Sequence, residues 1–175
     1  MTNVWRIHLR KGNSGDSVSI GAYCISKNIA AMGWGLESKN ADIKSQKISI
    51  NSYKDYEKYA NEETNLGKFY DVRRLACDVK PGDFIWTYYD GQYYLAQVRS
   101  DSKYQYDPSD EAIENEACNQ LTNIYWKKIG DRKEVDKRIT SRLQRGNTLQ
   151  RLYNPKNKKS KDNFDFALKY SQQSC

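Results

Sequence analysis

Aromatic side chains concentrate in one short stretch near the middle of this chain. The stretch contains Trp86, Tyr88, Tyr89, Tyr93 and Tyr94, and a β-sheet needs far fewer aromatic residues than this to hold together. Aromatic faces stack on other flat rings, which is how many nucleic-acid-binding proteins hold a base. This concentration therefore predicts a surface that binds a flat ring by stacking.

Positive charge is concentrated at the C-terminal end of the chain. Residues 127–175 contain 14 lysines and arginines against 5 acidic residues, whereas residues 1–126 contain 15 against 17. A one-sided basic segment is typical of surfaces that bind phosphate, although a solvated polar face that keeps a protein soluble has the same composition. The basic side chains that we predict to contact phosphates are Lys127, Lys128, Arg138, Arg142 and Arg145.

The sequence shows no pattern of metal ligands. Its cysteines, Cys24, Cys77, Cys118 and Cys175, are widely scattered, and His8 is the single histidine. A zinc site needs clustered Cys and His ligands, and a disulfide scaffold needs paired spacings. We therefore expect incidental thiols in a reducing compartment, with no metal and no cofactor.

Catalytic patterns are equally weak. Asp71 with Asp78–Lys80, and Asp90 with Asp101–Lys103, loosely match the acids and lysine of metal-dependent nucleases, but such matches arise by chance in a chain this rich in charge. His8 lies in an alternating strand with no evident nucleophile, and no phosphate-cradling loop or dinucleotide fingerprint occurs. The sequence predicts a protein without enzymatic activity.

The length of 175 residues suits one domain with its own core, or one domain with a tail. No stretch is long and apolar enough to span a bilayer, and residues 1–6 lack the basic-then-apolar layout of a signal peptide. We expect a cytoplasmic protein that does not bind membranes.

The aromatic residues lie in a predicted β-hairpin. Pro81, Gly82 and Asp83 mark a turn at its start. Asp90-Gly91 is a strong signal for a two-residue turn between strands, because both central residues of that turn need positive φ. The flanking segments are rich in aromatic and β-branched residues, which suit a pleated surface.

Other elements must surround this hairpin. Alternating apolar and polar residues predict a strand over residues 4–10 with one buried face. A short helix is expected within residues 20–31, followed by a strand end or turn at residues 31–35. Residues 52–55 match a helix-capping pattern, and apolar residues at three-and-four spacing predict a second helix over residues 65–78.

The second half of the chain predicts shorter elements. An acidic loop over residues 109–116 leads to a strand at residues 123–127. Val135, Ile139 and Leu143 recur at four-residue intervals and predict a short amphipathic helix with basic outer faces.

A strand over residues 148–153 completes the predicted domain, which covers residues 1–153. Residues 154–175 are lysine-rich and predict a flexible basic tail that can dock back through Phe164 and Phe166. Together these elements predict an α+β fold built on a strongly curved sheet or open β-barrel with inserted helices.

Several short motifs occur in a fixed order along residues 4–153. They are Val4–Ile7, Ala31–Gly35, Val79–Phe84, Tyr94–Val98, Tyr104–Pro108, Trp126 and Asn147–Leu152. In this order they resemble the EVE-type domain of the PUA-like superfamily, and more closely they are similar to the N-terminal modules of Mrr-like and McrB-like modification-dependent restriction proteins. Each motif alone is weak, so the order carries the resemblance.

This resemblance implies a PUA-like pseudo-barrel whose rim holds a modified, flipped-out base, as in restriction and defence proteins that bind DNA. It also implies an effector, a nuclease or GTPase. Too few residues follow residue 153 for such a domain, so we expect the effector on a separate chain.

The predicted pocket would hold the base between two aromatic walls. Trp34 is the first candidate because glycines on either side bring the backbone close to a ligand. For Trp34 and Trp86 the alternative is a place in the core, where large aromatic side chains are mostly buried. The predicted pocket residues are Gly33, Trp34, Trp86 and Tyr88, with Ser26 and Asn28 as candidates for hydrogen bonds to the base edge.

Two other functions fit the same sequence features. An RNA-binding module would use the same aromatic pocket and would be sensitive to the 2′-hydroxyl. A protein-interaction or inhibitor protein would use the aromatic hairpin and basic tail as an interface, since Tyr and Trp are also enriched there.

Overall fold

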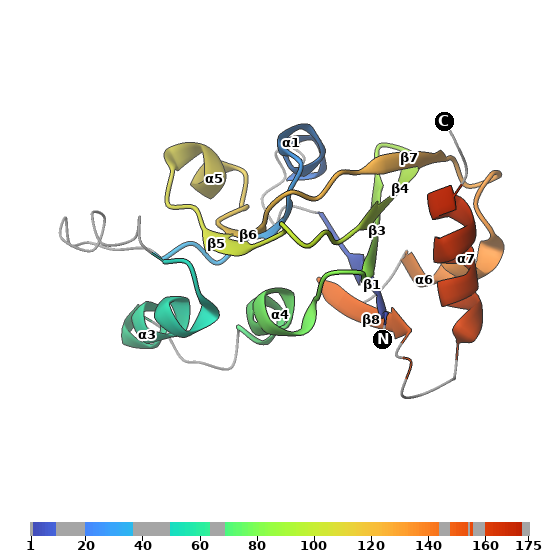
Figure 1. Cartoon of the computed structure of the whole chain (residues 1–175). Coiled ribbons are helices and arrows are strands. Elements are labelled where there is room, and N and C mark those ends of the chain that lie inside the picture. Colours follow the sequence, from blue (N-terminus) through green and yellow to red (C-terminus); the bar gives the residue numbers. More distant parts are fainter. Residues whose placement is uncertain are drawn as a thin grey trace. The chain divides into compact units, whose positions relative to one another are not determined.

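The computed structural model describes residues 2–9, 20–36, 50–63, 69–143, 148–153, 155 and 160–172. These residues form an α+β protein with two compact units, each assembled from separate segments of the chain (Figure 1). Unit 1 comprises Met1–Leu9, Val79–Ser102 and Asn123–Cys175, and unit 2 comprises Arg10–Asp78 and Lys103–Thr122. Nothing in the sequence marks this division, and the sequence motifs predicted a single domain over residues 1–153.

Unit 1 is built on an open five-stranded sheet in the order β7-β4-β3-β1-β8. Strands β1 and β3 are parallel, and the other neighbouring pairs are antiparallel. Among the described residues the strands form this sheet and a separate three-stranded one, and neither closes into a barrel. The strands of unit 1 are β1 (Val4–Ile7), β3 (Phe84–Tyr89), β4 (Gln92–Gln97), β7 (Lys127–Gly130) and β8 (Leu149–Tyr153).

The predicted hairpin is confirmed as β3 and β4. Asp90 and Gly91 form its turn with φ values of 47° and 75°, the left-handed geometry that a two-residue turn requires. The register pairs Trp86 with Leu95 and Tyr88 with Tyr93. The strand predicted over residues 148–153 is also confirmed, as the edge strand β8.

Strand β1 differs from its prediction because it is buried on both of its faces. All four of its residues are buried, so the expectation of one buried face is wrong. Arg6 is completely buried, and its Nη1 donates a hydrogen bond to the backbone carbonyl of Arg142. A helix leaves its last carbonyls without intrahelical partners, so the buried guanidinium stabilises the last turn of helix α6 (Lys137–Leu143).

Helices α6 and α7 (Lys161–Gln172) cover one face of this sheet (Figure 1). The predicted apolar residues Val135, Ile139 and Leu143 are all buried in the core of unit 1, but the helix begins only at Lys137, so Val135 precedes it. That core also contains one face of the strands and the inner side of α7. Its strand and α7 members are Val4, Phe84, Trp86, Tyr93, Leu95, Leu152, Ala167 and Tyr170.

The segment expected as a flexible tail contains helix α7, so that expectation is wrong for Lys161–Gln172. Phe164 and Phe166 pack against the core, as their apolar character predicted, and the Phe164 ring lies 5.6 Å from that of Tyr153. The buried side-chain amide of Asn163 donates to the carbonyl of Leu152. Predicted features at residues 154 and 156–159 lie outside the described residues.

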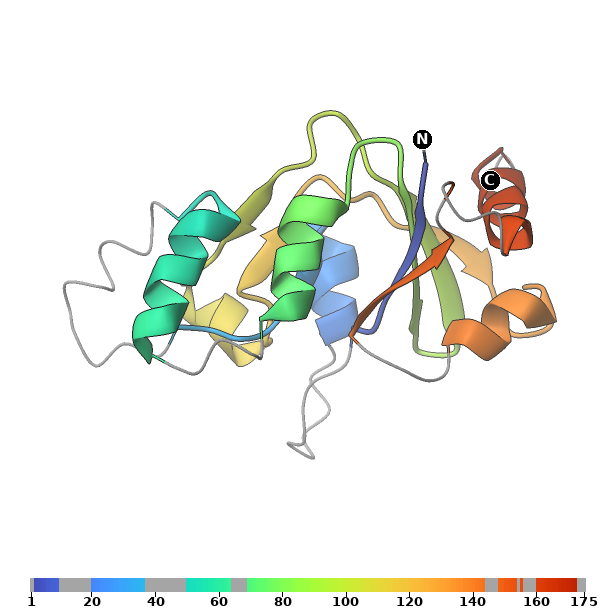
Figure 2. The ribbon, with the colours of Figure 1, turned by 90° about the horizontal axis from the view of Figure 1, so that it is seen from below.

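Unit 2 combines a three-stranded sheet with helices that come from both of its chain segments. The sheet order is β2-β6-β5, with both pairs antiparallel. Helix α3 and the α4 segment lie side by side in both ribbon views (Figures 1 and 2). The elements are α1 (Ile20–Lys27), β2 (Ala30–Met32), α3 (Tyr53–Glu63), α4 (Tyr70–Arg73), a π-helical turn (Arg74–Asp78), β5 (Tyr104–Tyr106), α5 (Asp110–Glu114) and β6 (Asn119–Leu121).

Three predictions in unit 2 are confirmed. The helix expected within residues 20–31 is α1, and the strand end or turn expected at residues 31–35 is β2 with the segment that follows it. The capping pattern is present at α3, where Ser52 Oγ accepts a hydrogen bond from the N–H of Asp55 at 3.1 Å.

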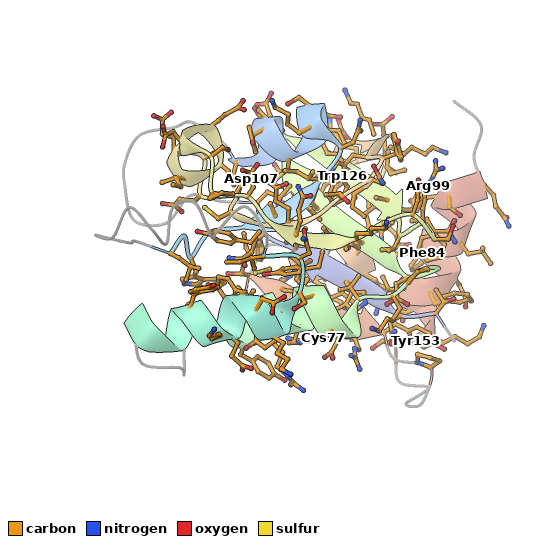
Figure 3. All side chains as sticks on the ribbon, turned by 60° about the vertical axis from the view of Figure 1, so that its left-hand side comes forward. Cys77, Phe84, Arg99, Asp107, Trp126 and Tyr153 are labelled. Carbon is orange, nitrogen blue, oxygen red and sulfur yellow. The ribbon has the colours of Figure 1, made fainter. Side chains whose placement is uncertain are left out.

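Three sequence expectations need correction. The acidic loop over residues 109–116 contains helix α5, because Ser109 Oγ caps it by accepting from the N–H of Ala112 at 3.2 Å. The strand expected at residues 123–127 begins only at Lys127, so Trp126, labelled in Figure 3, lies in an irregular segment. The helix expected over residues 65–78 begins at Tyr70 in the part of this segment that the structure describes, residues 69–78, and changes to π-helical geometry at Arg74.

The Pro81-Gly82-Asp83 turn does more than begin strand β3, because its carboxylate is buried. Asp83 accepts hydrogen bonds from the backbone N–H and side-chain amide of Asn3, from the indole of Trp5 at 2.8 Å, and from the N–H of Lys80 at 3.1 Å. These donors come from the turn itself and from the N-terminal segment. The carboxylate therefore fastens β1 to the start of β3.

No helix among the described residues has the length and apolar character that a membrane span requires.

Replacing Asp83 with Asn should destabilise unit 1. The amide presents an N–H₂ group to neighbours that are themselves donors, and buried donors left without partners cost about 1–3 kcal/mol. We expect urea denaturation of D83N to show a loss in that range. D165N is the matched control, because Asp165 pairs with Lys161 at an exposed site and its loss should cost less than ~0.5 kcal/mol. Equal losses in both variants would contradict the role of Asp83.

Candidate functional site

The predicted pocket residues are divided between the two units. Trp34, Gly33, Ser26 and Asn28 belong to unit 2, whereas Trp86 and Tyr88 belong to unit 1. Each set is therefore described within its own unit.

Trp86 cannot stack on a ligand, and its assignment to the pocket is wrong. Its side chain is completely buried in the core of unit 1, with the Tyr170 ring of α7 edge-on at 5.7 Å. Tyr88 lies two residues further along β3 and is exposed, with its ring 4.8 Å from that of Tyr93. Tyr88 remains available for stacking, but without Trp86 as a neighbouring wall.

Trp34 is exposed and holds an unusual backbone conformation. Its φ is +57°, in the left-handed region that costs an ordinary residue about 1–2 kcal/mol. A bulky residue persists there only when the surrounding structure enforces it, and such strain is common at binding sites. The indole is thus held at the surface by a backbone that favours glycine.

Two buried side chains enforce this conformation. The Nδ2 of Asn119, on β6, donates to the carbonyl of Gly33 at 2.6 Å and to that of Trp34 at 3.3 Å. The hydroxyl of Tyr56, on α3, donates to the same Trp34 carbonyl at 2.9 Å. Two consecutive carbonyl groups are therefore directed into unit 2.

The orientation of the Asn119 amide is itself fixed by Tyr104 of β5. The Tyr104 hydroxyl donates to Asn119 Oδ1 at 2.8 Å, which identifies that atom as the acceptor and leaves Nδ2 to face the carbonyls. Tyr106, on the same strand, accepts a hydrogen bond from the N–H of Leu36 at 2.7 Å. The segment from Gly33 to Leu36 is held at each end by residues of the sheet.

Aromatic packing supports the tyrosines that hold this segment. The Tyr56 ring lies 5.6 Å from Phe69 in an edge-on arrangement and 5.7 Å from Tyr106. Tyr53, one turn earlier on α3, lies 6.3 Å from Tyr56. We call Tyr53, Tyr56, Tyr104 and Tyr106 the tyrosine cluster.

Burial raises the pKa of the hydroxyls of three tyrosines in this cluster. It raises the pKa of Tyr53 to about 12, with a further contribution from the hydrogen bond that Tyr53 donates to Glu57. Burial also raises the pKa values of Tyr56 and Tyr104 well above the ordinary value of 10. The hydroxyls of Tyr53, Tyr56 and Tyr104 therefore remain hydrogen-bond donors even at pH 10, where an exposed tyrosine is half ionised.

The two remaining unit 2 candidates have local structural roles. Asn28 follows α1 with φ +55°, the left-handed position that ends many helices and that Asn tolerates well. Ser26 donates from Oγ to the carbonyl of Tyr23 within the same helix, at 3.0 Å. Both are exposed, so hydrogen bonding to a base edge stays a prediction for them.

Sequence reasoning missed Asn119, Tyr56 and Tyr104, which hold the Trp34 segment in place. Tyr104 and Tyr106 alternate along β5 and so share a face, which is the one local signal that was available. Asn119 is 85 positions from Trp34, and no spacing rule connects them.

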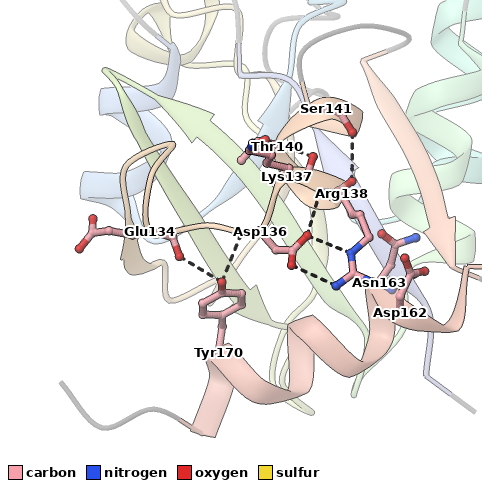
Figure 4. A network of polar contacts seen from close by, with 9 residues as sticks. All are labelled: Glu134, Asp136, Lys137, Arg138, Thr140, Ser141, Asp162, Asn163 and Tyr170. Carbon is pink, nitrogen blue, oxygen red and sulfur yellow. Dashed lines mark hydrogen bonds and ion pairs between the residues drawn. The ribbon is translucent and has the colours of Figure 1, made fainter.

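Three of the predicted phosphate-binding side chains contact helix α7, or the residue just before it, within unit 1. Arg138 forms a two-pronged pair with Asp136, at 3.0 and 3.1 Å (Figure 4). Its guanidinium lies 4.4 Å from the centre of the Phe166 ring. Arg142 donates to Ser160 Oγ at 3.0 Å, just before α7 begins.

At the other end of α7, Lys127 donates from Nζ to the carbonyl of Tyr170 at 3.0 Å. A cation at that position stabilises the C-terminal end of a helix. Lys128 is exposed on β7, and Arg145 lies outside the described residues. Phosphate binding stays a prediction for all five; Lys128, Arg138 and Arg142 are exposed, and Arg138 is already paired with Asp136.

Hydrogen bonds from Arg138 lower the pKa of the Asp136 carboxyl to about 2. The paired charges persist throughout the neutral range, and the contribution of the pair to stability is lost only as pH falls toward 2. Tyr170 adds a polar contact beside it, because its hydroxyl donates to the carbonyl of Glu134 and accepts from the N–H of Asp136 (Figure 4).

The described residues contain no group of three or more Cys, His, Asp and Glu side chains placed to hold a metal ion. Cys24 and Cys118 are buried, and burial raises the pKa of the Cys24 thiol to about 12. A thiol with so high a pKa is a poor nucleophile at neutral pH.

The chain belongs to the family described as Domain of unknown function (DUF8426), whose model matches residues 5–154. The match covers both the Trp34 segment and the hairpin. No curated protein and no solved structure matches the chain.

The backbone strain at Trp34 predicts an inverted order of stability for two substitutions there. Gly occupies the left-handed region without cost, whereas Ala does not, so W34G should be more stable than W34A by about 1 kcal/mol. Tyr70, the exposed first residue of α4, gives the control pair Y70A and Y70G. At that helical position Y70A should be more stable than Y70G by ~0.5–1 kcal/mol. Urea denaturation of the four variants measures both differences, and an Ala preference at position 34 would show that no strain exists.

The tyrosine cluster predicts a loss of stability at alkaline pH. Because the folded state raises the pKa of Tyr53 from 10 to about 12, this contribution is complete below pH 10 and is lost as pH rises toward 12. Near-ultraviolet absorbance of tyrosinate, measured against pH, should show that some tyrosines ionise only well above pH 10, together with unfolding. Y53F should reduce the amplitude of this high-pH step. Ionisation of all 14 tyrosines near pH 10 in the folded protein would contradict this prediction.

Proposed function

We propose that this protein is a non-enzymatic nucleic-acid-binding module that holds a single base against Trp34. The base is a modified, flipped base in DNA, and the enzyme that acts on it resides on another chain. The corresponding proposal for the fold is a divergent member of the PUA-like superfamily, in keeping with the order of the sequence motifs and with a mixed sheet that has helices inserted between its strands.

One observation carries this proposal: an exposed indole on a backbone that the interior of unit 2 holds in a strained conformation. A solvent-exposed tryptophan gains little for the folded protein itself. The left-handed φ adds a cost, and buried hydrogen bonds from Asn119 and Tyr56 are committed to maintaining it. This arrangement is understandable when the ring has a ligand.

The energetics of base binding are compatible with such a site. Stacking on an aromatic side chain contributes about 1–3 kcal/mol per base. Extrusion of a base from a duplex costs a few kcal/mol, and least for a damaged or mismatched base. A methyl group on the base would add about 0.8 kcal/mol if fully buried. Trp34 alone therefore supports modest affinity, and the remainder has to come from hydrogen bonds and phosphate contacts.

Phosphate contacts would come from the accessible cations Lys128 and Arg142 of unit 1. Contacts of this kind position a nucleic acid without selecting its sequence, and each released counterion makes binding dependent on salt. Arg138 and Lys127 contribute less, because Asp136 and the end of α7 already engage them.

Fluorescence anisotropy at fixed salt tests this function. Matched duplexes carry cytosine or adenine, or their methylated and hydroxymethylated forms, and an RNA of the same sequence is included. We expect a preference for one modified duplex, which W34G reduces about 10-fold because the ring is lost while the backbone conformation is kept. Preference for RNA at matched sequence would assign the RNA-binding alternative instead.

Two control variants separate base recognition from general attraction. Y70A removes another exposed ring of unit 2 and should leave binding unchanged. K128A should weaken binding to every duplex alike, and when the titration is repeated at several salt concentrations it should lower the salt slope by about 1. If W34G behaves like Y70A, or if binding is uniform across all duplexes, the proposed base-binding function is wrong.

A further inference from the structure

The carbonyl groups of Gly33 and Trp34 determine where the neighbouring N–H groups point. The peptide bonds of the described residues are all trans, and in a trans peptide the C=O and the following N–H lie on opposite sides of the bond. The Gly33 carbonyl faces Asn119, so the N–H of Trp34 faces away from it. The Trp34 carbonyl faces Asn119 and Tyr56, so the N–H of Gly35 is directed away from both.

These two N–H groups are available to a ligand. Trp34 and Gly35 are exposed, and neither N–H has a hydrogen-bond partner among the described residues. The next N–H, of Leu36, is used internally, because it donates to the Tyr106 hydroxyl at 2.7 Å. The exposed indole is thus accompanied by two consecutive backbone donors.

From this geometry we infer that the Trp34 segment selects a base by an edge that carries two adjacent hydrogen-bond acceptors, which the N–H groups of Trp34 and Gly35 recognise. The inference rests on the proposed base-binding function and adds its chemical selectivity. Two natural bases have such an edge: guanine through O6 and N7, and cytosine through O2 and N3. Adenine, thymine and uracil do not, because donors and acceptors alternate along their edges.

Selectivity follows from the cost of an unmatched donor. An adenine amino group facing a backbone N–H places two donors together, and neither is satisfied. Sites that hydrogen-bond a ligand reject analogues that lack the partner more strongly than apolar pockets do. We expect the loss of one acceptor to weaken binding about 5- to 10-fold.

Asn119 is the positioning residue of this donor pair. Its amide holds both carbonyls on the inner side, and Tyr104 prevents the amide from rotating. Replacement by Asp removes both donated hydrogen bonds and brings an anionic oxygen toward two carbonyl oxygens. The segment would then lose the orientation of its N–H groups, while the indole would remain able to stack.

Amide NMR on the ¹⁵N-labelled full chain tests this inference. The probes are oligothymidine strands that carry one central guanine, 7-deazaguanine, cytosine or adenine, with an all-thymine strand as reference. With guanine or cytosine, we expect the Trp34 and Gly35 amide protons to shift downfield and exchange more slowly with solvent. Whichever of the two bases binds more tightly identifies the edge, and 7-deazaguanine, which lacks N7, should bind about 5- to 10-fold more weakly than guanine.

Variants distinguish this inference from the proposed function. N119D should bind all strands nearly alike, without the two downfield shifts, and Y104F should show a milder loss of selectivity with the fold intact. Binding that W34G weakens, but that leaves both amides unshifted or favours adenine, would overturn the acceptor-edge inference and leave base stacking standing. If no strand shifts any resonance of the Trp34 segment, both proposals fail.

Discussion

The buried carboxylate of Asp83 is the interaction on which the sheet of unit 1 depends. Its partners come from the N-terminal segment and from the turn before β3, so a single residue joins two strands that are far apart in the chain. Burying an ionised group is costly unless hydrogen bonds satisfy it, and here several neutral donors do so. Register at this point then places Val4 opposite Phe84, and the core beneath α6 and α7 follows from that pairing.

Unit 2 also contains a buried polar side chain that is hydrogen-bonded to backbone groups, but its effect on the structure is different. The buried amide of Asn119 satisfies two carbonyl groups, but the backbone conformation that it stabilises is strained and leaves Trp34 at the surface. The hydrogen bonds of Asp83 stabilise the fold, whereas those of Asn119 maintain a surface backbone conformation that costs free energy. Buried polar groups that support strain are expected where a surface is shaped for a ligand.

The sequence predicted features that depend on neighbouring residues. The hairpin and its Asp90-Gly91 turn, the apolar stripe of α6 and the cap of α3 are local, and all of them form. Trp86 was misassigned because its face of β3 is covered by α6 and α7, which come from the end of the chain. The residues that orient Trp34 escaped prediction for the same reason: Asn119 reaches it through the pairing of β2 with β6, which no local pattern encodes.

Strand β1 is synthesised first but lies between two strands that are completed later, β3 and β8. Its parallel pairing with β3 joins residues about 80 positions apart, and such pairs cannot start from a tight turn. At ~5–20 residues per second on the ribosome, β1 waits for several seconds before β3 exists, and longer for β8. During that time Trp5 and Arg6, which are both fully buried in the folded protein, are exposed to water. Strand β1 can therefore enter the sheet only after β3 has been made, and its second neighbour, β8, follows later still.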